Sequence, residues 1–179
     1  MAAAQVATRH LIEVGRRRIA AIGDQPRPAS QTAHLRHQGY LEALGEVGLP
    51  APAELRCRVD AYHRADGAAA MHRLLDLREP PDAVFCFNDL LALGALRALH
   101  ERGVRVPEDV AVVGWDDIED GRYSMPTLTT ISPDKQQIAA LAVDFLARQL
   151  RGDRREAPRE VTADFTLAVR ESTTRSCRA

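Results

Sequence analysis

Segments with helical periodicity alternate with short apolar runs over residues 6–115. Apolar residues recur at spacings of three and four in the expected helices and fill strand-length runs between them. The runs 83–87 and 109–115 are continuously apolar, which is typical of strands covered on both faces of a parallel sheet. This order predicts a three-layer α/β/α fold with right-handed crossovers. The expected helices span residues 6–14, 33–47, 64–77 and 90–102, and the expected strands span residues 19–22, 55–59, 83–87 and 109–115.

The pattern changes after residue 115. A strongly amphipathic helix is expected there, with Ile138, Leu141 and Phe145 on its apolar face. The expected elements are a strand at 127–131, the helix at 136–150, strands at 161–165 and 167–169, and a frayed tail at 174–179.

Composition and charge exclude several classes of protein. With 45% hydrophobic and 27% charged residues, the chain is typical of a globular domain rather than a disordered one. The formal net charge of −1 argues against a chain that coats nucleic acid by itself. No apolar run reaches the roughly 18 residues of a membrane span, and the N-terminus has no apolar core of a secretory signal. Cys57, Cys86 and Cys177 are too scattered for a disulfide framework, so we expect a cytoplasmic protein.

Polar and aromatic side chains follow each of the four expected strands. Ligands of an open parallel sheet lie outside the carboxyl ends of its strands, and this topology collects those ends at one rim. Arg36 lies near the start of the helix after the first strand, and Tyr62 follows the second strand. Asn88 follows the third strand, and Trp115 with Asp116 ends the fourth. We therefore expect these five residues to form a ligand-binding site.

The chemistry of these five side chains fits a small polyhydroxylated molecule. Arg36 offers hydrogen-bond donors, Asp116 offers acceptors, and Asn88 offers both. Tyr62 and Trp115 offer flat faces on which the C–H face of a sugar ring can stack. Hydrogen bonds to charged groups contribute about 1.5–3 kcal/mol each, so a few of them can set specificity.

Each of these residues also has a plain structural interpretation. Asn88 could serve only as a helix N-cap, and Asp116 could belong only to a turn. Trp115 could be part of the core, Arg36 a solvated helix residue, and Tyr62 a surface or packing residue. The residues alone leave these alternatives open.

We find no sequence pattern for an enzyme, a metal site or a cofactor. The chain has no G-x-S-x-G elbow, no phosphate-binding loop and no dinucleotide fingerprint. His34 and His37 lie one helical turn apart, but no carboxylate or cysteine joins them at ligand spacing. We therefore expect a non-enzymatic protein with no catalytic residues, no metal and no cofactor.

Several sequence blocks resemble the ligand-sensing part of the LacI/GalR (lactose- and galactose-repressor) family of bacterial transcription regulators. Their combination is specific because they occur in the family's order and spacing. The blocks are ATRHLIEVGRRRIAAIG (7–23), RHQGYLEAL (36–44), PPDAVFCFNDLLALGALRAL (80–99), GVRVPEDVAVVGWDD (103–117), MPTLTTISPD (125–134) and LAVRES (167–172).

The resemblance implies a fold similar to type I periplasmic binding proteins, with a ligand between two lobes. Sugars, nucleosides or purines bind there in the family and alter operator binding by a separate helix-turn-helix. Arg36 matches the family arginine before G-Y, and Asn88 and Asp116 match the N-D and G-[YFW]-D-D blocks. Tyr62 aligns less securely with a position that is often aromatic. Lys135 stands at a cleft-edge position where the family often has an aromatic residue.

By the same resemblance, these residues are mainly the C-terminal lobe. Residues 4–131 match that lobe, residues 132–173 match the returning helix and strands that complete both lobes, and residues 174–179 are a tail. The helix-turn-helix and most of the N-terminal lobe are missing from the match. We therefore expect weak or no ligand binding by this chain alone, because closed pockets bury most of their ligand.

The sequence thus predicts the effector-sensing part of a LacI-type regulator. The expected partners are a sugar, nucleoside or similar effector, and a second copy or an intact relative in a dimer. Operator DNA is expected to bind only through the missing module, and no membrane partner is expected. A fragment of a transport-type sugar-binding protein, or a non-functional remnant, stays open as an alternative. An in-frame helix-turn-helix upstream would favour the regulator, and a secretory leader would favour transport.

Overall fold

The computed structural model describes residues 1–25, 31–151 and 161–174. The tail expected at 174–179 therefore lies outside the described residues from residue 175 onward. The helices are α1 (Ala2–Glu13), α2 (Gln31–Glu46), a 3-10 turn η1 (Ala53–Leu55), α3 (Arg64–Leu75), α4 (Asp89–Glu101), α5 (Glu119–Arg122) and α6 (Lys135–Leu150). The strands are β1 (Ile19–Asp24), β2 (Arg56–Arg58), β3 (Ala83–Cys86), β4 (Ala111–Trp115), β5 (Thr129–Pro133) and β6 (Phe165–Ala168).

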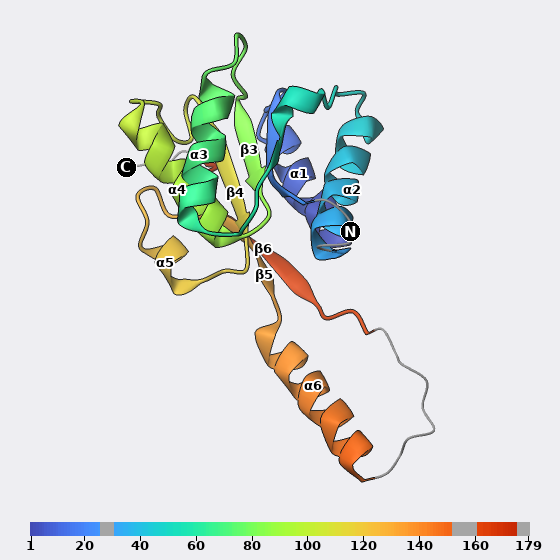
Figure 1. Cartoon of the computed structure of the whole chain (residues 1–179). Helices are drawn as coiled ribbons and strands as arrows, with labels where there is room; N and C mark the ends of the chain where they lie inside the picture. The colour runs from blue at the N-terminus through green and yellow to red at the C-terminus, as the bar shows by residue number, and fades with distance from the viewer. Residues whose placement is uncertain (26–30, 152–160, 175–179) are drawn as a thin grey trace.

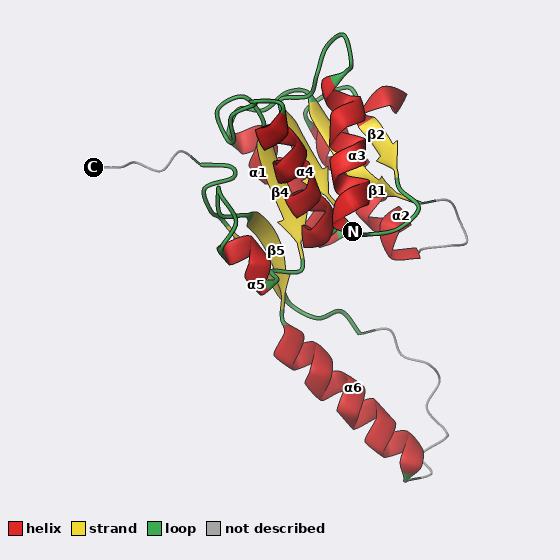
Figure 2. Cartoon of the chain, turned by 60° about the vertical axis from the view of Figure 1, so that its left-hand side comes forward, coloured by secondary structure: helices red, strands yellow, loops and turns green. Residues whose placement is uncertain are grey.

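The predicted three-layer fold with a parallel sheet is confirmed. The six strands have the order β2-β1-β3-β4-β5-β6, and every pair is parallel except β5 with β6. Helices α1 and α2 pack together on one side of the sheet, and α3 and α4 pack together on the other (Figures 1 and 2). The carboxyl ends of the parallel strands therefore share one edge of the sheet.

The centre of the sheet holds the core. Every residue of β3 is buried, as the continuous apolar run predicts. On the α2 side, the fully buried Tyr40 donates a hydrogen bond from Oη to the carbonyl oxygen of Ile19 at 2.8 Å. This bond gives the phenol a partner inside the core and fixes α2 to the start of β1.

Two strand predictions near the C-terminus are wrong. The strand expected at 127–131 lies two residues later, at Thr129–Pro133. The two strands expected at 161–165 and 167–169 are a single strand, β6, which pairs antiparallel with β5. The pairing ends with Pro133 opposite Phe165, where the chain turns into α6. Strand β6 therefore begins only at Phe165, because β5 ends at Pro133, the residue opposite it.

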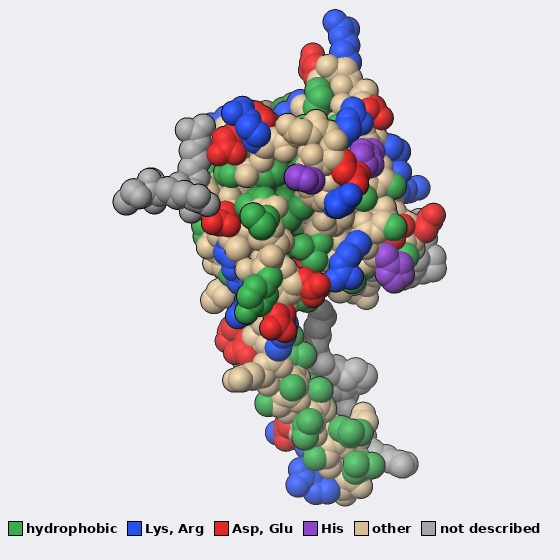
Figure 3. Space-filling model, turned by 90° about the vertical axis from the view of Figure 1, so that its left-hand side faces the viewer, with side chains coloured by type: hydrophobic (Ala, Val, Ile, Leu, Met, Phe, Trp, Pro, Cys, Tyr) green, Lys and Arg blue, Asp and Glu red, His purple; other side chains and the backbone are tan. Residues whose placement is uncertain are grey.

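Helix α6 forms an arm that leaves the body of the molecule (Figures 1 and 2). None of its residues is buried. Ile138, Leu146 and Leu150 are 46%, 57% and 80% exposed, and Figure 3 shows hydrophobic side chains along the arm. Of the apolar face expected for this helix, Ile138 is exposed, and Leu141 and Phe145 are half-buried. In the part of the chain that the structure describes, no helix is long and apolar enough to cross a membrane.

Gly94 allows α3 and α4 to approach closely, and we expect Gly94→Ala to destabilise the fold by about 1–3 kcal/mol. A Cβ atom at Gly94 would lie 1.9 Å from the carbonyl oxygen of Arg64, which is backbone and cannot rotate away. Gly45→Ala is the matched control, because a Cβ atom there meets nothing within 4 Å. It should be neutral or stabilising by up to about 1 kcal/mol. Urea unfolding measures both, and equal stabilities of the two variants would contradict the predicted clash.

The exposed face of α6 should cause self-association, because large exposed apolar patches bind other apolar surfaces. We expect the chain to form dimers or larger species with rising concentration in light scattering. The double variant Leu146→Glu, Leu150→Glu should shift the population toward monomer. Gln149→Glu, which adds charge on the same helix at a polar exposed position, should leave it unchanged. A monodisperse wild-type monomer at all concentrations would contradict this prediction.

Candidate ligand-binding site

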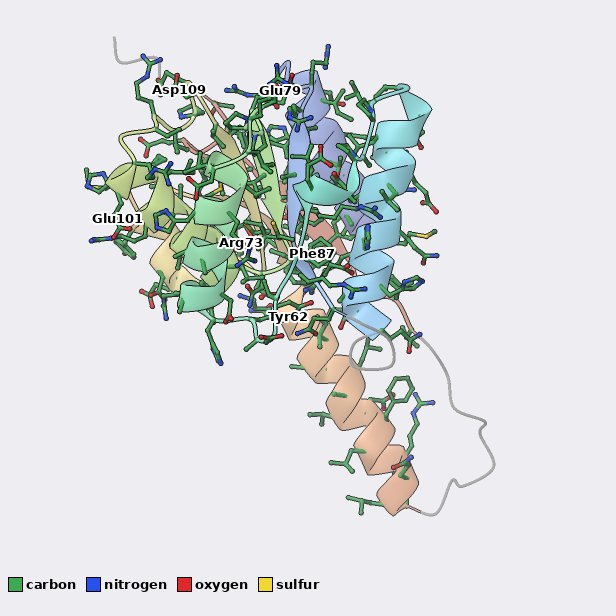
Figure 4. The ribbon with its side chains drawn as sticks, turned by 45° about the horizontal axis from the view of Figure 1, so that its top comes forward. Tyr62, Arg73, Glu79, Phe87, Glu101 and Asp109 are labelled. Atoms are coloured by element: carbon green, nitrogen blue, oxygen red, sulfur yellow. The ribbon has the colours of Figure 1, made fainter. Side chains whose placement is uncertain are left out.

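The guanidinium of Arg36 lies among the carboxyl ends of the strands. Its Cζ atom lies 4.3 Å from the centroid of the Trp115 ring, at the end of β4. Its Nη1 atom donates a hydrogen bond to the carbonyl oxygen of Phe87, just after β3. Figure 4 shows Tyr62 and Phe87 toward the end of the body from which α6 leaves, with Glu79 and Asp109 at the opposite end.

Asn88 caps helix α4 and also contacts Tyr62 at the rim. Its Oδ1 atom accepts a hydrogen bond from the backbone N–H of Leu91 at 2.8 Å, so the N-cap interpretation is confirmed. Its Nδ2 atom donates to the carbonyl oxygen of Tyr62 at 3.2 Å. The cap thereby fixes the amide orientation, and Nδ2 has a second N–H beside the one that it donates to Tyr62.

Tyr62 connects the second and first strand ends. Its Oη atom donates a hydrogen bond to the carbonyl oxygen of Gly23, near the end of β1, at 2.8 Å. The hydroxyl hydrogen is therefore used within the protein. The structure thus places Arg36, Tyr62, Asn88, Trp115 and Asp116 at one rim, as the sequence predicts; their binding role stays a prediction.

Asp116 has an unusual environment for a carboxylate. Burial raises its pKa to about 6, with Asp89 raising it further, while the charges of Arg36 and Lys135 offset part of this shift. Burial also lowers the pKa of Arg36, which the negative charge of Asp116 opposes. Among the described residues, no hydrogen bond reaches the Asp116 carboxylate. An ionised carboxylate accepts hydrogen bonds through both of its oxygens.

The backbone at this point is in an uncommon conformation. Asp116 has φ = 116° and Asp117 has φ = 48°, both in the region that favours glycine. Such strain persists only where surrounding contacts hold it, and it concentrates at functional sites. Here the Asp116 amide donates to the carbonyl oxygen of Ile131 at 2.9 Å, which holds the loop to β5.

Sequence reasoning missed the residues around Asp117. This aspartate accepts hydrogen bonds from Arg122 and Arg170 at 2.8 and 2.6 Å, and its carbonyl oxygen accepts one from Lys135 at 2.9 Å. Arg170 belongs to the LAVRES block, which supported the resemblance but suggested no contact. The signal available was the pair Asp116-Asp117 directly after a continuous apolar strand, because a carboxylate near the core needs charged or hydrogen-bonding partners.

The described residues contain no group of three histidine, cysteine or acidic side chains arranged to hold a metal. His37, one of the two histidines on α2, instead lies with Nδ1 at 3.2 Å from Oδ1 of Asp24.

Comparisons with known proteins agree with this geometry. Residues 8–173 match the family described as "Periplasmic binding protein-like domain". The chain belongs to this family. Its relatives are LacI-type transcriptional regulators rather than enzymes, which confirms the resemblance to the LacI/GalR effector-binding domain.

One relative is the HTH-type transcriptional repressor PurR of Photorhabdus laumondii subsp. laumondii. It is 40% identical over 153 residues, which cover 85% of this chain and 44% of that protein. The chain spans about half the length of the curated relatives it matches.

Solved structures of this family superpose closely. A LacI-type transcription regulator from Bifidobacterium animalis subsp. lactis has 38% identity and a TM-score of 0.86, covering 95% of this chain and 63% of its own. The transcriptional regulator CelR in complex with cellobiose has 36% identity and a TM-score of 0.88, covering 96% and 51%. The periplasmic-binding-protein-like fold is therefore shown by both sequence and structure.

We expect Asp116 to titrate near pH 6 in the folded chain. Its pKa of about 6 exceeds the ordinary value of 3.8. Between these two pH values the folded chain keeps the carboxyl proton of Asp116, whereas the unfolded chain has released it. The contribution of Asp116 to the free energy of unfolding is therefore greatest below about pH 4 and falls as the pH rises toward 6. Urea unfolding at closely spaced pH values should show this decline in the wild-type chain and its loss in Asp116→Asn.

Asp109→Asn is the control for this titration. Hydrogen bonds from Arg105 lower the pKa of the exposed Asp109 to about 2, below the interval of interest. The variant should keep the decline between pH 4 and 6. A midpoint near the ordinary value of 3.8 for the Asp116 carboxyl carbon in a chemical-shift titration would contradict the predicted effect of burial.

Proposed function

We propose that this chain is the effector-sensing part of a LacI-type transcriptional regulator and binds a hydroxyl-rich metabolite at the rim formed by Arg36, Asn88 and Asp116. The observation that carries the proposal is the convergence of these side chains, which come from α2 and two strand ends, in a chain of this family. The complex of the similar CelR with cellobiose supports a sugar-like ligand.

The donor and acceptor arrangement favours a ligand with adjacent hydroxyl groups. Arg36 and the Nδ2 atom of Asn88 donate, whereas the Asp116 carboxylate accepts. A diol whose hydroxyl groups each donate and accept satisfies all three side chains. Trp115 acts on the ligand chiefly through Arg36, because the guanidinium lies against its ring.

We assign residues 4–131 to the C-terminal lobe, residues 132–173 to the segment that crosses to the other lobe and returns, and residues 174–179 to a tail. The segment assignment is supported by α6, which leaves the body and exposes its apolar side chains. The other wall of the cleft would come from the part of the relatives that this chain does not match.

The remaining roles follow from the regulator assignment. The parent protein works in the cytoplasm as a homodimer, or pairs with intact relatives, and contacts operator DNA through a helix-turn-helix outside these residues. The effector changes the angle between lobes, and no enzymatic step, cofactor or metal is assigned to the chain.

This chain should bind cellobiose, or another member of a panel of sugars and nucleosides, only weakly, with a Kd of about 1 mM or higher. One lobe leaves much of the ligand in water, whereas closed pockets bury most of it. Chemical-shift perturbation in NMR spectra detects such binding and should locate it at Asn88 and Asp116. A sub-micromolar Kd in calorimetry would contradict the need for a second lobe.

Arg36→Met should raise the Kd of the ligand that binds best at least about tenfold, because a hydrogen bond to a charged group contributes about 1.5–3 kcal/mol. Arg97→Met is the matched control, since Arg97 pairs with Glu101 at 2.6 Å on the exposed side of α4. The control should bind like the wild-type chain. Equal affinities of the two variants, or perturbations far from Asn88 and Asp116, would reject the site.

A further inference from the structure

Apolar packing does not fix the direction of the α6 arm, since none of its residues is buried. Polar contacts at the base of α6 connect the helix only to the chain segments directly before and after the arm. Asp134 accepts a hydrogen bond from the backbone N–H of Gln137 at 2.8 Å, and the backbone N–H of Asp164 donates to Oε1 of Gln137 at 2.6 Å. These bonds hold α6 to the chain that returns from it, but not to the body.

The sheet stops supporting the arm before α6 begins. The pairing of β4 with β5 ends at Trp115 opposite Ile131. Beyond this point only the two-stranded ribbon of β5 and β6 continues, as far as Pro133 opposite Phe165. We call residues 132–135 the outgoing crossing and residues 164–170 the returning crossing. Two-stranded ribbons are marginally stable alone, so further contacts must hold the crossings to the body.

Asp117 is the body residue that both crossings contact. From the outgoing crossing, Ser132 donates a hydrogen bond from Oγ to Oδ2 at 3.0 Å, and Lys135 donates from Nζ to the Asp117 carbonyl oxygen at 2.9 Å. From the returning crossing, Arg170 donates from Nη2 to Oδ1 at 2.6 Å. Arg170 also donates from Nη1 to the carbonyl oxygen of Leu128 at 2.7 Å, so its guanidinium is held at two points.

The Asp117 carboxylate is itself held firmly. Its side chain is 8% exposed, and Arg122 of α5 donates a further hydrogen bond to Oδ2 at 2.8 Å. Burial alone would raise the pKa of Asp117, but the hydrogen bonds from Arg170, Arg122 and Ser132 outweigh it and lower the pKa to about 2. The carboxylate is therefore charged at every pH near neutrality, and its contacts persist.

We propose that Asp117 is a positioning residue that fixes the direction of α6 relative to the loop carrying Asp116. One carboxylate joins the outgoing crossing, the returning crossing and α5, so removing its charge weakens all three carboxylate contacts together, while Lys135 keeps its bond to the backbone carbonyl oxygen. Removing the charge would also leave Arg170, whose side chain is 19% exposed, without its anionic partner. This role does not depend on which ligand binds, or on whether one binds at all.

The test measures the direction of the arm in the folded chain. Spin labels at Gln38→Cys on α2 and Gln149→Cys on α6, both exposed positions, report the distance between body and arm by pulsed electron resonance. Cys177→Ser removes the third cysteine, while Cys57 and Cys86 are buried. Excess unlabelled chain suppresses distances between molecules. We expect one narrow distance distribution in this background and its loss, with a broad distribution, in Asp117→Asn.

Asp120→Asn is the matched control, because it makes the same chemical change at an exposed aspartate that pairs with Arg64 at 2.7 Å. It should keep the narrow distribution. Measurements well below each melting temperature separate the direction of the arm from global stability. A merely structural role of Asp117 would lower the stability and leave the distance distribution unchanged. Should Asp117→Asn fail to fold, Ser132→Ala and Arg170→Lys weaken the contacts of one crossing each and should broaden the distribution partially. Narrow distributions in the folded variants, or equal broadening in Asp120→Asn, would overturn the proposal.

Discussion

Burial of the parallel strands on both faces is the constraint on which the candidate site depends. Because β1, β3 and β4 are covered by helix pairs on each side, their polar chain ends can meet water only at the edges of the sheet. Parallel pairing then brings all the carboxyl ends to the same edge. Arg36, Asn88 and Asp116 are therefore neighbours as a consequence of core formation, although they lie far apart in sequence.

The body and the arm are stabilised by different interactions. In the body, fully buried side chains such as Tyr40 and Phe85 remove apolar surface from water. In the arm, α6 buries nothing, and its base is held by charged and polar groups around Asp117. Hydrogen bonds are directional whereas apolar packing is not, so a few polar contacts can set the direction of a helix without adding much stability.

The sequence predicts the body well because continuous apolar runs and helical periodicity are local signals of burial. It also predicts the position of the five rim residues, since each ends a strand or lies in the segment after one. It fails where the outcome depends on a distant partner. The segments 161–165 and 167–169 both look like strands, but only the presence and end of β5 decide that Phe165–Ala168 pairs. Likewise, nothing in LAVRES indicates that Arg170 reaches an aspartate 53 positions away.

The neighbouring aspartates after β4 show how environment divides roles between identical side chains. Burial dominates at Asp116 and raises its pKa to about 6, while Arg36 lies near enough to act electrostatically. Burial also acts at Asp117, but hydrogen bonds from Arg170, Arg122 and Ser132 together outweigh it and lower the pKa to about 2. The Asp117 carboxylate uses its hydrogen-bonding capacity within the protein, whereas no described residue donates a hydrogen bond to the Asp116 carboxylate. Both residues have an uncommon backbone conformation, and their neighbours differ: Arg36 and Lys135 act on Asp116 electrostatically, whereas Ser132 and Arg170 donate hydrogen bonds to Asp117.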